Sequence, residues 1–168
     1  MYVVVCDIDS TIADPEHRLH YVKKDPPDWA AFLSVDEVSK DKKIVAAEKP
    51  LKYLLDTCSD FFFLTSRQDY LRDVTSFWLE KAFGIEVEYS RLIMRPTGQN
   101  SPASDHKFNS FNRLIRPKIP MNLPILLFDD DAYVLSRMRG AALTFKAPEC
   151  WEVMWYGPPK IPESTIAV

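Results

Sequence analysis

Glycine is scarce in this chain of 168 residues, which has only four, and none of them precedes a lysine. This excludes the GxxxxGK[ST] loop that binds phosphates in many nucleotide-dependent enzymes. The three cysteines are widely spaced and form no CxxC pair, so we expect reduced, structural thiols. The sequence also lacks a signal peptide and any apolar run of membrane-spanning length. These absences predict a soluble, cytoplasmic protein with no membrane partner.

An excess of positive charge is also missing. The net charge of −3 gives no broad attraction to nucleic acid, so any such binding must come from a local basic patch. Apolar residues at 46% and charged residues at 27% are typical of a globular domain, and the length fits one domain. We expect that domain to cover residues 1–150. A tail rich in Pro, Trp and Tyr follows at 151–168, and we expect irregular packing over the sheet from Pro148 onward.

Short apolar runs alternate with helical patterns along most of the chain. The runs predict strands at residues 2–6, 61–64, 91–94, 124–128 and 142–145. The patterns between them predict helices at residues 45–58, 69–83, 105–116 and 132–139. Such alternation predicts an α/β fold with a doubly wound, mostly parallel sheet.

Residues 12–45 interrupt this alternation with a polar stretch after the first strand. It has room for one or two short helices, one of them near residues 29–33 with Asp28 as its N-cap. We expect this small cap insert to leave an open cleft, which suits the end of a polymer. Alternatively, the insert folds over as a lid for a nucleotide-sized substrate. Trp29 could then stack on a base, but we expect it to pack against the core, as aromatic residues of short helices usually do.

Polar side chains follow three of the predicted strands directly. Asp7 and Asp9 follow the first strand, residues 65–67 (Thr-Ser-Arg) end the second, and residues 129–131 (Asp-Asp-Asp) follow the fourth. Alone, the first group is as typical of a polar turn as of an active site, the second most often marks a strand entering a turn, and the third most often marks a helix N-terminus. Because the carboxyl ends of parallel strands share one sheet edge, we expect these groups to form one pocket with oxygen ligands suited to Mg²⁺. Lys107 is the candidate for a fixed cation that balances a phosphate.

These residues resemble the four motifs of the haloacid dehalogenase superfamily, in order. Asp7-x-Asp9-x-Thr11 is similar to the first motif, Thr65 to the second, Lys107 to the third, and the pair at 129–130 to the fourth. Ser10 stands where most members have Gly. A DxDST variant occurs in the superfamily's phosphoserine phosphatase group, so this departure does not argue against activity.

The resemblance implies a Mg²⁺-dependent phosphatase. Asp7 would attack phosphorus to form an aspartyl-phosphate, and Asp9 would act first as acid and then as base. Mg²⁺ would be held by Asp7, the backbone carbonyl of Asp9, and Asp129. Asp130 would orient Lys107 or a metal-bound water.

A narrower resemblance is to the 3′-phosphatase domain of phage polynucleotide kinase and the small stand-alone phosphatases related to it. It lies in Thr65-Ser66-Arg67, Met94-Arg95-Pro96 and the segment from Gly98 to Lys107. It implies that Arg67 and Arg95 hold the substrate's phosphate or sugar. The residues expected to contact substrate are Thr11, His17, Arg18, Ser66, Arg67 and Arg95.

Three functions follow as hypotheses. The first is a phosphatase of polynucleotide 3′-phosphate ends, and the second is a phosphatase of free nucleotides or other small phosphoesters. The third is a non-enzymatic phospho-acceptor. The third is disfavoured because Asp9, two residues after the nucleophile, is placed to hydrolyse an acyl phosphate quickly.

Overall fold

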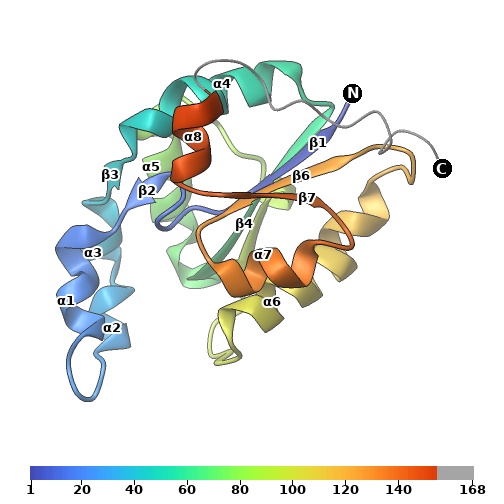
Figure 1. Cartoon of the computed structure of the whole chain (residues 1–168). Coiled ribbons are helices and arrows are strands. Elements are labelled where there is room, and N and C mark those ends of the chain that lie inside the picture. Colours follow the sequence, from blue (N-terminus) through green and yellow to red (C-terminus); the bar gives the residue numbers. More distant parts are fainter. Residues whose placement is uncertain (155–168) are drawn as a thin grey trace.

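The computed structural model describes residues 1–154, and residues 155–168 lie outside the described part. The described residues form one parallel five-stranded sheet in the spatial order β5-β4-β1-β6-β7 (Figure 1). The strands are β1 Val3–Cys6, β4 Asp60–Gln68, β5 Leu92–Arg95, β6 Ile125–Asp129 and β7 Leu143–Lys146. The predicted α/β fold is confirmed.

Helices cover both faces of the sheet (Figure 1). Alternate residues of β1 point to opposite sides: Val4 and Cys6 belong to one hydrophobic cluster, and Val3 and Val5 to the other. The first cluster includes residues of α4, α5 and α8. The second includes residues of α7, and Phe108 of α6 packs against it. Burial on both faces explains why β1 reads as an uninterrupted apolar run. These helices are α4 Glu48–Thr57, α5 Arg72–Phe83, α6 Ala103–Ser110, α7 Ala132–Met138 and α8 Glu149–Met154.

Several predicted helices begin or end in tighter or wider turns. Gly84, with φ of 69°, ends α5 in the left-handed conformation that glycine tolerates best. The predicted helix at 105–116 is observed as α6 followed by a π-helical turn, Phe111–Ile115. The 3₁₀ turns are Glu16–Arg18, Val45–Ala47, Asp69–Leu71, Tyr89–Arg91 and Arg116–Lys118.

The cap insert contains more regular structure than the sequence predicted. A two-stranded antiparallel stem, β2 Ala13–Asp14 and β3 Lys42–Lys43, closes it. Between these strands lie α1 Leu19–Val22, α2 Trp29–Phe32 and α3 Val35–Ser39. Asp28 caps α2 as predicted. Ser34 caps α3 by accepting a hydrogen bond from the Glu37 N–H, which the prediction of one or two helices missed.

Two predictions are wrong, one about Trp29 and one about the chain after Pro148. Trp29 does not pack into the core, because 57% of its surface is exposed. The chain just after Pro148 is not irregular, because residues 149–154 form α8. Trp151 of α8 is fully buried, stacks on Phe128 of β6 at 4.8 Å between ring centroids, and donates to the Thr11 carbonyl at 2.7 Å. Trp151, rather than Trp29, is therefore the tryptophan that packs into the core against β6. The rest of the predicted tail lies outside the described residues.

Across residues 1–154, no helix has both the length and the apolar character needed to cross a membrane.

Candidate active site

The turn after β1 brings two carboxylates to the carboxyl edge of the sheet. Asp7 directly follows β1, and its N–H donates to the Phe128 carbonyl of β6 at 2.9 Å. The turn closes through N–H groups of residues 11–13, which donate to the Ile8 carbonyl. Ser10 has φ of 58°, a left-handed conformation that favours glycine. This is the physical reason why glycine is usual at the position where this chain has Ser10.

Lys107 joins the first and fourth motifs. Its Nζ lies 2.8 Å from Asp7 Oδ1 and 2.7 Å from Asp129 Oδ2, and all three side chains are buried. Burial alone would lower the pKa of Lys107, but the two carboxylates raise it above its usual value, so the side chain is a fixed cation. Thr11 Oγ1 donates to the other Asp7 oxygen at 3.2 Å. The structure therefore brings these predicted residues together.

Asp7, Asp129 and Asp130 form a carboxylate group that could hold a metal ion. One oxygen from each lies within 4.8 Å of the others. Burial raises the pKa of Asp7 to about 7, although Lys107 acts in the opposite direction. Burial and the nearby Asp7 raise the pKa of Asp130 to about 6, and burial also raises that of Asp129. One lysine does not offset two buried carboxylates and a third that is half-buried, so a hard divalent cation such as Mg²⁺ fits this oxygen set.

The Asp9 side chain faces a different set of partners. Its carboxylate accepts from Arg67 Nη2 at 2.8 Å and Nε at 3.0 Å, and from Arg18 Nη2 at 2.5 Å. Burial favours the neutral carboxyl, but the arginines outweigh it and lower the pKa of Asp9 to about 2. Asp9 is therefore ionised at neutral pH in this arrangement.

Asp41 completes this network, and no sequence motif pointed to it. It lies in the charged run at residues 39–43, next to the β3 strand of the cap stem. Arg18 Nε donates to Asp41 Oδ1 at 2.7 Å, and Arg67 Nη2 donates to Asp41 Oδ2 at 2.5 Å. A lone acid among lysines usually marks a solvated loop, so no local signal could have found it.

Arg18 and Arg67 were predicted to contact the substrate. In the structure both are fully buried, and their guanidinium groups contact Asp9 and Asp41. Their partners are thus internal carboxylates, and they join the cap to the core. His17 also lies within the cap, with Nε2 at 3.0 Å from the Glu37 carbonyl oxygen.

Arg95 and Ser66 lie at the ends of neighbouring strands and have unused hydrogen-bonding atoms. Arg95 Nη1 donates to the Ser101 carbonyl at 3.0 Å. Arg95 Nε, Ser66 Oγ and Ser101 Oγ are buried without a hydrogen-bond partner in the described chain. Burial lowers the pKa of Arg95, and no carboxylate of residues 1–154 forms an ion pair with it. Buried polar atoms normally have partners, so each of these three atoms is available to a polar or anionic ligand.

The buried side chain of His106 contacts the backbone of Thr65. Its Nε2 lies 3.2 Å from the Thr65 carbonyl oxygen. Burial, with smaller contributions from the positive charges of Arg95 and Lys107, lowers the pKa of His106 to about 4. The neutral ring can donate to that carbonyl, and the Thr65 hydroxyl accepts from the Arg67 N–H at 3.1 Å. Thr65 is thus fixed at the carboxyl edge of the sheet.

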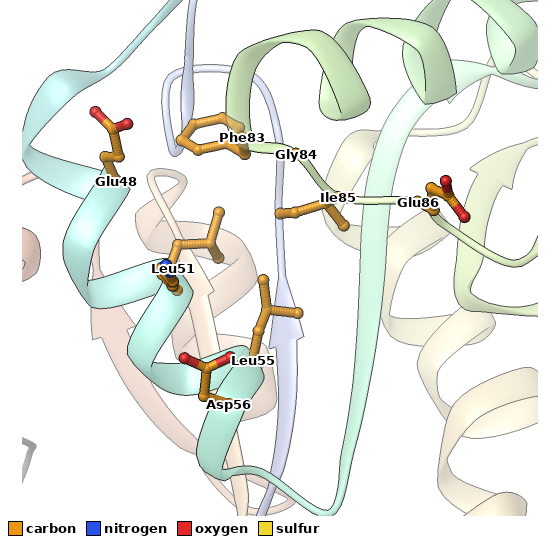
Figure 2. A pocket seen from close by; sticks show the side chains of 9 residues that line it. Glu48, Leu51, Leu55, Asp56, Phe83, Gly84, Ile85 and Glu86 are labelled. Atoms are coloured by element: carbon orange, nitrogen blue, oxygen red, sulfur yellow. The ribbon is translucent and has the colours of Figure 1, made fainter.

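A hollow lies elsewhere, between α4 and the chain that follows α5 (Figure 2). Its volume is about 530 Å³, and Figure 2 shows the apolar side chains of Leu51, Leu55 and Ile85 lining it. None of the predicted site residues lines this hollow. It is therefore separate from the carboxylate site.

No protein-family model matches the sequence. Among curated proteins, the chain is similar to a proposed bifunctional polynucleotide kinase/RNA ligase of Autographa californica nuclear polyhedrosis virus, with 30% identity over 129 residues. The match covers 76% of this chain and 16% of the viral protein. The chain thus spans only a small part of that relative's length.

Solved structures define the fold class. A haloacid dehalogenase-like family hydrolase from Streptococcus pneumoniae matches with a TM-score of 0.60 and 12% identity, covering 95% of this chain and 92% of that one. A class C acid phosphatase from Bacillus anthracis matches with a TM-score of 0.61 and 15% identity, covering 98% and 76%. At these identities the likeness shows the fold, which is that of haloacid dehalogenase-like hydrolases. The resemblance predicted from the motifs is confirmed at this level.

A further structural match is to a chain of the Pnkp1/Rnl/Hen1 RNA repair complex. Its TM-score is 0.61 at 20% identity, and it covers 87% of this chain but 42% of that chain. The fold is therefore also present in an RNA repair assembly.

Proposed function

We propose that this chain is a Mg²⁺-dependent phosphomonoesterase that acts on the 3′-phosphate end of a polynucleotide. The observation that carries the proposal is the position of Asp7. Its carboxylate lies beside Lys107, shares a possible metal site with Asp129 and Asp130, and is followed two residues later by a second acid, Asp9. This is the set of groups that an aspartyl-phosphate route requires.

In this proposal Asp7 forms a bond to phosphorus while the bond from phosphorus to the leaving oxygen breaks. Lys107 and the Thr65 hydroxyl stabilise negative charge on the phosphoryl oxygens. Thr11, which donates to Asp7, holds the nucleophile in place. Mg²⁺, held by Asp7, Asp129 and Asp130 with the Asp9 carbonyl, would supply further charge to the phosphoryl oxygens when bound.

Asp9 is proposed to transfer protons in both halves of the reaction. Its low pKa of about 2 means that it is ionised before substrate arrives. That state suits the second half, in which Asp9 accepts a proton from the water that hydrolyses the intermediate. In the first half, Asp9 must be protonated to donate to the leaving oxygen. A substrate phosphate that adds negative charge beside Asp9 raises its pKa toward that state.

The polynucleotide end is supported by two observations. Arg95, Ser66 and Ser101 offer a guanidinium and two serine hydroxyls with unused hydrogen-bonding capacity, which suits a phosphate or sugar beside the reacting group. The relatives include a polynucleotide kinase/RNA ligase and an RNA repair complex. A free-nucleotide phosphatase is the second candidate. The ion pair between Arg18 of the cap and Asp9 favours it, because a cap held against the site can cover a small substrate as a lid.

An assay of phosphate release with Arg95→Ala separates the two candidates. The substrates are 3′-phosphorylated oligonucleotides, 5′-phosphorylated oligonucleotides, free nucleoside monophosphates and an aryl phosphate. We expect Arg95→Ala to lower kcat/KM on the 3′-phosphorylated oligonucleotide by about 10- to 100-fold, the worth of a charge-assisted contact. The loss on the aryl phosphate should be far smaller.

Arg139→Ala is the matched control. Arg139 is an exposed arginine at the C-terminal end of α7, whereas the carboxylates at residues 129 and 130 precede the N-terminal end of this helix. It should leave every substrate unchanged. If free nucleoside monophosphates are the better substrates and chain length adds nothing, the free-nucleotide function replaces the polynucleotide one.

A further inference from the structure

Trp29 is an exposed indole on the cap, and its surroundings connect it to the catalytic carboxylates. It begins the single turn of α2, and 57% of its surface is exposed. Its ring meets Phe32 edge to face, with centroids 5.8 Å apart and planes at 90°. The indole therefore packs against Phe32 while much of its surface is exposed to solvent.

The same phenylalanine contacts the site network. The Arg18 guanidinium lies 4.3 Å from the centroid of the Phe32 ring, and Arg18 Nη1 donates to the Phe32 carbonyl at 3.1 Å. Arg18 in turn donates to Asp9 at 2.5 Å. A continuous series of contacts thus runs outward from the Asp9 carboxylate, through a guanidinium and a ring, to the indole of Trp29.

Further contacts lead from α2 toward Arg95. The Tyr70 hydroxyl, in the turn after β4, donates to the Leu33 carbonyl at 2.7 Å, and Tyr70 is 47% exposed. Its neighbour Asp69 accepts from the Thr97 N–H at 3.0 Å, in the loop that follows Arg95. These contacts link α2, the turn at residues 69–71 and the loop that follows Arg95, and we call these three segments the rim of the site.

We propose that Trp29 is the stacking platform for the terminal nucleobase of the substrate. This inference rests on the proposed function and narrows its substrate class to phosphomonoesters that carry a base. A nucleobase offers a flat π-face to an exposed indole, and such stacking tolerates any base. The rim gives each part of a nucleotide a complementary group: carboxylates and lysine for the reacting phosphate, Arg95 for a sugar or second phosphate, and Trp29 for the base.

The test compares two 3′-phosphorylated oligonucleotides that differ only in the terminal residue, which is a normal nucleotide in one and abasic in the other. Wild type should prefer the substrate with the base. Trp29→Ala should lower kcat/KM on that substrate by about ten-fold or more and leave the abasic substrate unchanged. Trp29→Phe, which keeps a flat ring, should retain most of the preference.

Phe77→Ala is the matched control, since Phe77 is an aromatic residue 64% exposed midway along α5. It should change neither substrate. If Trp29→Ala slows both substrates equally, or neither, the platform is overturned while the phosphatase stands. If instead Asp7→Asn releases phosphate as fast as wild type, the proposed function itself fails.

Discussion

Asp7 and Asp9 are two residues apart in one turn, yet their surroundings shift their carboxyl pKa values in opposite directions. Asp7 is buried against one lysine and two further carboxylates, and its pKa rises to about 7. Asp9 is half-buried, and Arg67 and Arg18 lower its pKa to about 2. Identical side chains therefore suit different tasks because of their partners.

His106 gives a second prediction at the same scale. Its pKa is about 4 in the folded protein and near 6.5 when exposed, so the unfolded chain binds a proton more readily. The contribution of His106 to the free energy of unfolding should therefore fall as pH decreases from 6.5 toward 4, and the difference between wild type and a variant without the imidazole isolates it from the carboxylates. His106→Gln, which can still donate to the Thr65 carbonyl, should lose less stability over this range. Urea unfolding at several pH values measures the difference.

His20→Gln is the control for this experiment, because His20 is exposed on the cap. It should follow the wild-type pH dependence. An equal slope of unfolding free energy against pH for wild type and His106→Gln would show that His106 does not titrate as the structure requires.

Among the elements, the strands were predictable and the cap was not. β1 and β6 are buried on both faces, so their apolar runs and the polar residues that follow them were visible in the sequence. The helices of the cap are four or five residues long, and their stability depends on side-chain caps and tertiary contacts rather than on periodicity. The role of Asp41 depends on Arg18 and Arg67, which are 23 and 26 positions away.

The cap should depend on Asp41 more than on any surface acid of the insert. Asp41→Asn leaves two buried guanidinium groups with one carboxylate fewer, which should destabilise the protein by about 3 kcal/mol. It should also reduce turnover, because both arginines then act on Asp9 alone. Asp36→Asn is the control: the Asp36 side chain is 77% exposed and pairs with Lys40 on the surface. It should change stability by about 0.5 kcal/mol or less.

Chemical denaturation and steady-state kinetics on both variants measure these effects. Similar losses for Asp41→Asn and Asp36→Asn would mean that the buried network does not hold the cap.

At the scale of the whole molecule, the sheet order explains why residues so distant in sequence meet. β1 lies at the centre, between β4 and β6, so Asp7, Thr65 and Asp129 reach one edge from three adjacent parallel strands. Lys107 comes to the same edge from α6. This convergence could be predicted because parallel strands point the same way. The positions of Trp29 and α8 could not, because they depend on how the cap and the C-terminal helix pack.

The most direct measurement is phosphate release from a 3′-phosphorylated oligonucleotide, in Mg²⁺, in EDTA, and after Mg²⁺ is restored. Wild type should lose activity by about 100-fold or more in EDTA and recover it with Mg²⁺, since three carboxylates and a phosphate require a cation to share this site. Asp7→Asn should be folded but inactive in every condition. Undiminished release in EDTA, or an Asp7→Asn variant as active as wild type, would contradict the proposed chemistry.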